Sequence, residues 1–151
     1  MIRAWRIVKA RHSANAFDGE GARRLGGRWN SPGTGMIYTS ETAALAALEM
    51  LVHLSRFTTL TAYVVIRCDF AEKLVTDAGK LPSNWRKFPA PPQLQAIGDA
   101  WVKSGKSAVL RVPSTIIPSE SNYLLNPAHA SFDRIKIGRP ERFELDIRLI
   151  R

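Results

Sequence analysis

Residues 26–53 read GGRWNSPGTGMIYTSETAALAALEMLVH, and this stretch decides most of the expected fold. It predicts a basic glycine-rich loop, a short strand at residues 36–39 and an apolar helix at residues 41–55. Ser40 is a favourable N-cap, and Glu41 suits the positive end of a helix. Because the helix is apolar on nearly every side, we expect it to be buried.

Two charged residues in this stretch indicate a binding or catalytic site. Glu49 lies among Ala, Leu and Met, where an ionised carboxylate is costly without a partner or a task. Arg28 is the candidate partner, and the two glycines before it allow a ligand to approach the backbone. An arginine fork suits phosphate, and a half-desolvated glutamate suits a sugar hydroxyl or a developing positive charge. The pair predicts a site for an anionic sugar-nucleotide.

Structural alternatives exist for both residues. Arg28 can be a surface arginine beside a packed Trp29, and Glu49 can form a buried ion pair. His53 lies one turn further along the same helix face and can hydrogen-bond Glu49.

Composition narrows the class of protein. The chain has 151 residues, enough for one domain with a real core, and no apolar run of the ~18 residues that a membrane span needs. The first residues lack the apolar core of a secretory signal, so we expect a cytoplasmic protein. The single cysteine, Cys68, lies in an apolar strand pattern and is read as a core residue.

The net charge of +9, from 22 basic and 13 acidic residues, fits a polyanionic partner. Nucleic acid, a phosphate-bearing ligand and an acidic protein are all compatible with it. The basic residues are spread along the whole chain, which weakens the nucleic-acid interpretation.

The remaining pattern mixes strands and helices irregularly. Apolar spacing from Leu94 to Trp101 predicts a helix at residues 93–103. Residues 13–35 are expected to form a long loop, and the proline-rich residues 81–92 an irregular segment. Strands are predicted at residues 4–8, 62–68, 107–112, 134–137 and 142–150, the last from strict alternation of apolar and polar residues. The order favours an α+β fold over a doubly wound sheet.

A second polar cluster occupies residues 112–129, VPSTIIPSESNYLLNPAH. Ser114 follows a proline at a predicted strand end, and Asn122 and Asn126 bracket a tyrosine and two leucines. Short polar side chains at strand ends are typical of ligand-binding rims, although they also cap turns.

Other kinds of site are not predicted. The three histidines, His12, His53 and His129, are far apart in sequence and have no cysteine pair to join, so no metal site is expected. Ser114 lacks the glycines of a nucleophile elbow. Residues 19–27, GEGARRLGG, lack the strand and helix that a dinucleotide fingerprint requires.

At these residues the chain resembles the RES domain family, the toxin half of bacterial RES–Xre toxin–antitoxin pairs. The family is named for an arginine, a glutamate and a serine, which match Arg28 in GGRWN, Glu49 in the helical block and Ser114 in VPS. Its tyrosine before the helix matches Tyr38, and its asparagine-rich motif matches NYLLNPAH. The resemblance covers nearly the whole chain.

The resemblance implies an ADP-ribosyltransferase-like fold, with a split and twisted β-sheet and flanking helices around an NAD cleft, in one domain over residues 1–151. It implies cleavage of NAD at the nicotinamide–ribose bond, by hydrolysis or with inorganic phosphate as co-substrate. Some relatives instead attach ADP-ribose to a protein. The implied partner is an Xre-type helix-turn-helix antitoxin, with operator DNA bound only through it and with homodimers inside the complex.

The same resemblance assigns roles. Glu49 would stabilise the oxocarbenium-like ribose, and Arg28 would clamp the pyrophosphate. Tyr38 would stack on nicotinamide, and Ser114 would orient the ribose or the carboxamide. The NAD-binding set is completed by Asn122 and Asn126. A non-catalytic nucleic-acid-binding module remains an alternative, against which the Glu49 carboxylate counts. Residues 81–105 receive no role.

Overall fold

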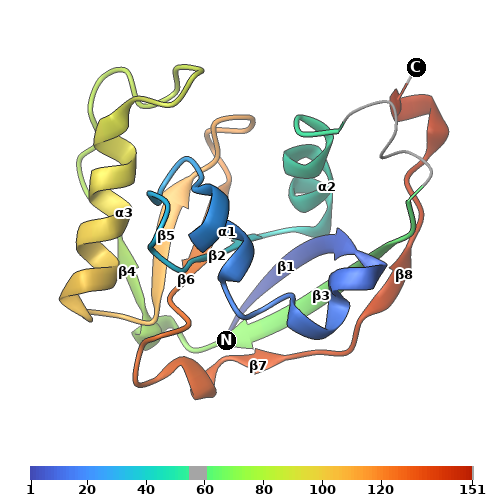
Figure 1. The fold of residues 1–151 in the computed structure, drawn as a ribbon, viewed down its shortest axis with the longest axis horizontal. Helices are drawn as coiled ribbons and strands as arrows, with labels where there is room; N and C mark the ends of the chain where they lie inside the picture. Colours follow the sequence, from blue (N-terminus) through green and yellow to red (C-terminus); the bar gives the residue numbers. More distant parts are fainter. Residues whose placement is uncertain (55–60, 151) are drawn as a thin grey trace.

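The computed structural model describes residues 1–54 and 61–150, and within them one sheet organises the fold (Figure 1). Its strands are β1 (Ile2–Lys9), β2 (Ile37–Ser40), β3 (Tyr63–Phe70), β4 (Val75–Asp77), β5 (Val109–Pro113), β6 (Ser121–Leu125), β7 (Lys136–Ile137) and β8 (Glu141–Phe143). The α-helices are α1 (Glu20–Leu25), α2 (Ala43–Leu51) and α3 (Pro92–Ser104). Short 3₁₀ helices lie at Ala10–Asn15, Glu72–Leu74, Phe132–Arg134 and Ile147–Ile150.

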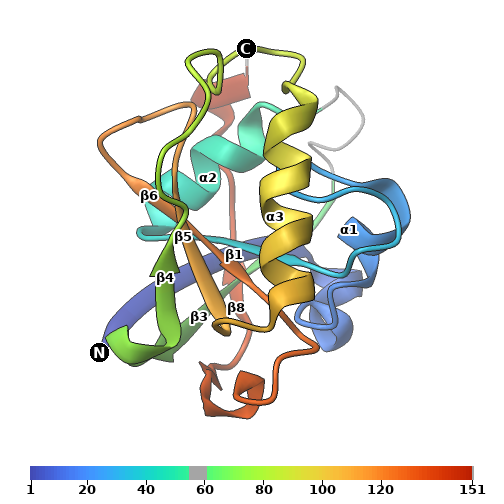
Figure 2. The same cartoon turned by 90° about the vertical axis from the view of Figure 1, so that its left-hand side faces the viewer.

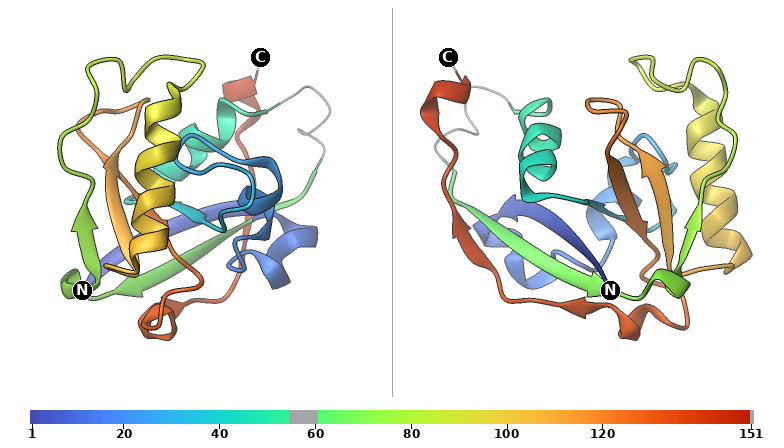
Figure 3. Two further views of the ribbon diagram at one scale, coloured as in Figure 1. Left: turned by 60° about the vertical axis from the view of Figure 1, so that its left-hand side comes forward. Right: turned by 180° about the vertical axis from the view of Figure 1, so that it is seen from behind.

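The strands follow the order β4-β5-β6-β2-β1-β3-β7, and β8 also pairs with β3. All pairs are antiparallel except β4 with β5. β1 pairs with β3 along its whole length but meets β2 at one position, Trp5 opposite Ser40. The sheet therefore divides between β1 and β2, and its two parts diverge, as the view from behind in Figure 3 shows. This is the split, twisted sheet of an α+β fold that the resemblance implies.

Arg6 of β1 joins the two parts where the ladder supplies few hydrogen bonds. Its Nη1 donates to the carbonyl of Tyr38 at 2.9 Å, and its Nε donates to the carbonyl of Ala16 at 2.7 Å. Burial lowers the pKa of Arg6 to about 10, so the side chain stays charged at neutral pH.

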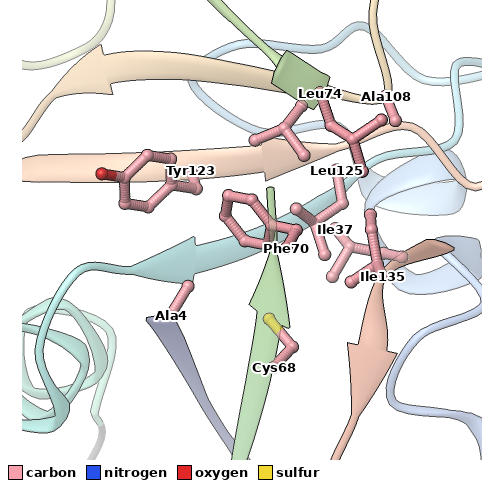
Figure 4. Packing of buried hydrophobic residues seen from close by; sticks show 10 residues of the cluster. Ala4, Ile37, Cys68, Phe70, Leu74, Ala108, Tyr123, Leu125 and Ile135 are labelled. Atoms are coloured by element: carbon pink, nitrogen blue, oxygen red, sulfur yellow. The ribbon is translucent and has the colours of Figure 1, made fainter. Parts of the chain in front are cut away.

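One face of the sheet carries a core contributed by both parts, shown in Figure 4. The rings of Phe70 and Tyr123 meet edge to face with centroids 5.4 Å apart. Cys68 is fully buried here, and burial raises the pKa of its thiol to about 12. The prediction that Cys68 is a core residue is confirmed.

A second core lies between α3 and the opposite face of the sheet, around Trp29, Met36, Leu94, Trp101, Leu110, Val112 and Leu124. Figure 2 shows α3 running alongside β4 and β5. At Gly98 the helix also packs tightly on the loop before β2, because a Cβ atom there would lie 1.6 Å from the carbonyl oxygen of Trp29. A glycine is therefore required at that position, and the predicted helix is confirmed.

The structure corrects several predicted elements. The expected loop at residues 13–35 contains α1 and the end of a 3₁₀ helix. α2 begins at Ala43 and its N-cap is Thr42, whose hydroxyl accepts from the amide of Leu45. The prediction of Ser40 as N-cap is wrong because its hydroxyl bonds to Asn122 instead.

The apolar surface of α2 is less buried than predicted. Leu45 and Ala46 are its buried residues, whereas Val52 just beyond it is 62% exposed. The helix packs on the sheet with one side only, so the expectation of burial on every side is wrong. The predicted helix end, Ser55, lies outside the described residues.

The strand predicted at residues 142–150 is also wrong beyond Phe143. β8 pairs with β3 through Phe143, and the chain then forms a 3₁₀ helix in which Ile147 is 78% exposed. The alternation of residue types therefore does not continue as a strand over residues 147–150. β4 and β6 were not predicted as strands. Within the described residues, no helix is long and apolar enough to span a membrane.

Candidate functional site

The Glu49 carboxylate is held by two side chains distant in sequence. The Ser114 hydroxyl and the Asn122 amide each donate to Oε1 of Glu49 at 2.8 Å. Ser114 is fully buried, and Glu49 and Asn122 are half-buried. Both donors converge on one oxygen, so they fix the rotation of the carboxylate and leave Oε2 to other partners.

Strand register brings these residues together. Asn122 on β6 lies opposite Ser40 on β2 and opposite Val112 on β5, so their side chains share one face of the sheet. Ser114 follows directly after β5, as predicted. Its Oγ also accepts from the amides of Ile116 and Ile117 at 3.1 Å, which fixes the turn.

The start of α2 is tied to the same strand. The carboxylate of Glu41 accepts from the backbone amide of Ser121 at 2.8 Å, and the amide of Glu41 donates to the carbonyl of Ser121. These bonds hold the helix against the first residue of β6, and Glu49 lies two turns further along. The sheet and the helix therefore place Glu49, Ser114 and Asn122 as one unit.

Arg28 lies within electrostatic range of this unit but does not bond to it. Its Nη1 donates to the carbonyls of Trp85 and Lys87, each at 3.1 Å. Burial lowers the pKa of Arg28, while the charge of Glu49 acts to raise it. Arg28 and Glu49 therefore attract each other electrostatically, while Ser114 and Asn122 donate the hydrogen bonds to the carboxylate.

The hydrogen bonds of Arg28 hold the proline-rich residues 81–91 beside the site. The Trp85 side chain packs against the α3 core, and Nε of Arg86 donates to the carbonyl of Thr115 at 2.8 Å. This segment therefore runs from Arg28 to the residue after Ser114. Figures 1 and 2 show it at the same end of the molecule as α2 and the loop after β5.

The loop that carries Arg28 is held by hydrogen bonds from α3 and β2. Nε2 of Gln95 in α3 donates to the carbonyls of Gly27 and Asn30, at 2.9 and 3.1 Å. Tyr38 Oη donates to Oδ1 of Asn30 at 2.6 Å and accepts from the amide of Trp29 at 3.1 Å. Burial raises the pKa of Tyr38. Its hydroxyl therefore supports the Arg28 loop, and stacking of its ring on a ligand stays a prediction.

Asn126 lies apart from the other predicted residues. It follows the far end of β6 from Asn122, is 2% exposed, and its Oδ1 accepts from the amide of Ala128 at 3.0 Å. The structure does not bring Asn126 to Glu49, and its side chain forms a turn. His53, the other predicted partner of Glu49, is exposed. The Glu49 carboxylate accepts from Ser114 and Asn122 instead.

Two features of the site were missed by sequence reasoning. Ser40, read as a helix cap, donates to Oδ1 of Asn122 at 2.8 Å. The anchoring of residues 81–91 had no sequence signal beyond their prolines. Within the described part of the chain, no group of three or more His, Cys, Asp or Glu side chains gathers into a metal-binding arrangement.

Comparison with known proteins shows the family and the fold of the chain. A family model described as RES domain matches residues 3–146 of the chain. The chain belongs to the RES domain family. This RES domain is 38% identical over 148 residues to a protein named Toxin Res from Yersinia enterocolitica serotype O:8 / biotype 1B, covering 96% of this chain and 97% of the relative.

It is also 34% identical over 154 residues to a protein named Prs ADP-ribosylating toxin from Sphingobium sp. (strain YBL2), covering 97% of this chain and 96% of the relative. Its fold is similar to that of a chain in the crystal structure of the M.tuberculosis MbcT-MbcA toxin-antitoxin complex, with a TM-score of 0.78 and 19% identity. That match covers 95% of this chain and 84% of the other.

Proposed function

We propose that this RES domain is the toxin of a toxin–antitoxin pair and that it consumes NAD by breaking the nicotinamide–ribose bond. The relatives named Toxin Res support the first part. The second rests on one observation, the Glu49 carboxylate fixed by Ser114 and Asn122 within electrostatic range of Arg28.

The fixed carboxylate suits this chemistry. When the glycosidic C–N bond breaks, its electron pair stays with nicotinamide, which leaves neutral and needs no acid. The ribose develops oxocarbenium character, and a carboxylate already oriented by two donors stabilises that charge without reorganising. Oε2 of Glu49 is the oxygen that would accept from a ribose hydroxyl.

Arg28 and Ser114 would act in different ways. Arg28 uses Nη1 for the carbonyls of Trp85 and Lys87, so Nε and Nη2 are the donors for a pyrophosphate. The Ser114 hydroxyl already donates to Glu49 and accepts from two amides. We therefore assign Ser114 the task of orienting Glu49, and Tyr38 the task of forming the wall behind Arg28.

The acceptor of ADP-ribose distinguishes three reactions. Water gives ADP-ribose and a proton, phosphate gives a phosphorylated ADP-ribose, and a protein nucleophile gives an ADP-ribosylated protein. The relative named Prs ADP-ribosylating toxin specifically favours the last as the second candidate. A nucleic-acid-binding module is disfavoured because the Glu49 carboxylate would repel phosphates at the centre of the site.

The deciding experiment incubates the purified protein with NAD, with and without phosphate, and follows free nicotinamide and the ADP-ribose product. Nicotinamide release that Glu49→Gln abolishes would support the proposal. Glu144→Gln is the matched control, because this carboxylate is exposed and pairs with Arg142. Absence of nicotinamide release under both conditions, with no labelling of added cell proteins, would refute NAD consumption.

The partner proposal follows from charge. We propose an Xre-type helix-turn-helix antitoxin that covers the site with an acidic segment, in a complex containing a toxin homodimer. Operator DNA would be bound through the antitoxin. The +9 charge of the chain favours such a segment, and the cytoplasm is the compartment where NAD and the antitoxin meet the toxin.

A further inference from the structure

We propose that Ser40 is a positioning residue for Glu49 and acts through the Asn122 side chain, an inference that rests on the proposed function. The Ser40 hydroxyl donates to Oδ1 of Asn122 at 2.8 Å, and Nδ2 of Asn122 donates to Oε1 of Glu49 at 2.8 Å. Ser40 is 4% exposed, so its hydroxyl is withdrawn from solvent. It contacts neither Arg28 nor the Glu49 carboxylate directly in these bonds.

The chemistry of the amide makes this contact decisive. An ionised carboxylate only accepts hydrogen bonds, so Asn122 must turn its NH₂ group toward Glu49. A donor at the opposite end of the amide selects that orientation, and the Ser40 hydroxyl is such a donor. With the amide turned over, Oδ1 would face the carboxylate and repel it.

Strand pairing keeps the two groups in register. Ser40 and Asn122 are direct partners across β2 and β6, so their side chains stand next to each other on one face. Asn122 then lies between β2 and Glu49 on α2. The strand register, fixed by the core, is thereby transmitted to the orientation of the carboxylate.

The neighbouring residue provides a matched control. Thr39 is 2% exposed, and its hydroxyl donates to the carbonyl of Tyr123 at 2.8 Å. Successive strand residues face opposite sides of the sheet, so Thr39 points away from Glu49. Thr39→Val removes an equally buried hydroxyl from the same strand. It leaves the hydrogen bonds from Ser40 to Asn122 and from Asn122 to Glu49 unchanged.

The kinetic test compares Ser40→Ala with Thr39→Val in nicotinamide release. We expect Ser40→Ala to lower kcat about tenfold, the effect of one buried polar group losing its donor, with KM changed less than about twofold. Thr39→Val should keep the wild-type kcat. In an Asn122→Ala background, Ser40→Ala should lower kcat no further, because the amide that links Ser40 to Glu49 is already absent. Equal kcat values for the two single variants, or an additive loss in the double variant, would overturn the proposal.

A second readout is independent of NAD. The side-chain NH₂ resonances of Asn122, assigned by their loss in Asn122→Asp, should shift and exchange faster with water in Ser40→Ala but not in Thr39→Val. If the wild-type protein releases no nicotinamide, the proposed function fails. The Asn122 resonances then decide alone whether Ser40 orients the Asn122 amide. Unchanged resonances in Ser40→Ala would overturn the orientation of Asn122 by Ser40.

Discussion

Replacing Gly98 by alanine is expected to loosen the contact between α3 and the loop that carries Arg28. A Cβ atom at this position would lie 1.6 Å from the carbonyl oxygen of Trp29 and 2.8 Å from its carbonyl carbon. Real Cβ atoms essentially never come closer than 3.0 Å to such neighbours. The obstacle is backbone rather than a flexible side chain, so the helix and the loop must separate by more than an ångström.

Two effects oppose each other in this variant. Alanine stabilises a helix interior by about 1 kcal/mol relative to glycine. Overpacking of a filled interior costs about 1–3 kcal/mol and sometimes more, and a backbone overlap of this size belongs at the upper end. The steric cost wins, and we expect a net loss of about 2 kcal/mol or more in the free energy of unfolding. For a chain of this length that corresponds to a fall of roughly 4–8 °C in Tm.

Urea unfolding of the two proteins measures this loss, and nicotinamide release reports whether the Arg28 loop moves with it. Gly21→Ala is the control, because Gly21 lies in α1 and has nothing within 4 Å of an added Cβ. Helix propensity acts alone there, so Gly21→Ala should be neutral or slightly stabilising. A Gly98→Ala protein as stable as the wild type would refute the close approach of α3 to Trp29.

Three further predictions concern activity. Glu49→Gln should lower NAD turnover about a hundredfold or more with the fold retained, because the amide oxygen can still accept from Ser114 and Asn122 while the charge is lost; near-wild-type turnover measured by nicotinamide release would remove Glu49 from the chemistry. Arg28→Lys should raise KM for NAD and expose residues 81–91 to proteolysis, since an ammonium cannot replace a fork that serves two carbonyls; normal kinetics would place the phosphate clamp elsewhere. Expression of the toxin should arrest growth as cellular NAD falls, and an Xre-type antitoxin should restore both. Arrest at constant NAD would indicate protein ADP-ribosylation, and arrest by Glu49→Gln would exclude catalysis as its cause.

Local sequence pattern was enough to predict the elements that pack against apolar neighbours. The β-branched run before Cys68 and the apolar spacing of α3 identified a core strand and a helix. It was not enough where tertiary pairing decides, as after Phe143, where the alternation continues but residues 147–150 form a 3₁₀ helix. β6 went unrecognised because Ser121 and Asn122 begin it, and these polar residues serve the site rather than the core.

The types of the site residues could be predicted, but their partners could not. Glu49 was singled out because a carboxylate in an apolar helix needs compensation, yet it was paired with Arg28 or His53. Its donors lie 65 and 73 residues away, at Ser114 and Asn122. Only the β5–β6–β2 register brings them together, and no local signal encodes that register.

The division of the sheet between β1 and β2 also affects the position of the site residues. β1 and β2 share one pair, so the strand bearing Tyr38 and Ser40 is held mainly by β6 on one side and by the Arg6 side chain on the other. In a full ladder between β1 and β2, a backbone amide would donate to the Tyr38 carbonyl in place of the Arg6 guanidinium. The hydrogen bond from Arg6 to the Tyr38 carbonyl therefore stabilises the divergence of the two parts of the sheet. This divergence lets α2 pack against both β1 and β2, which places Glu49 above Asn122.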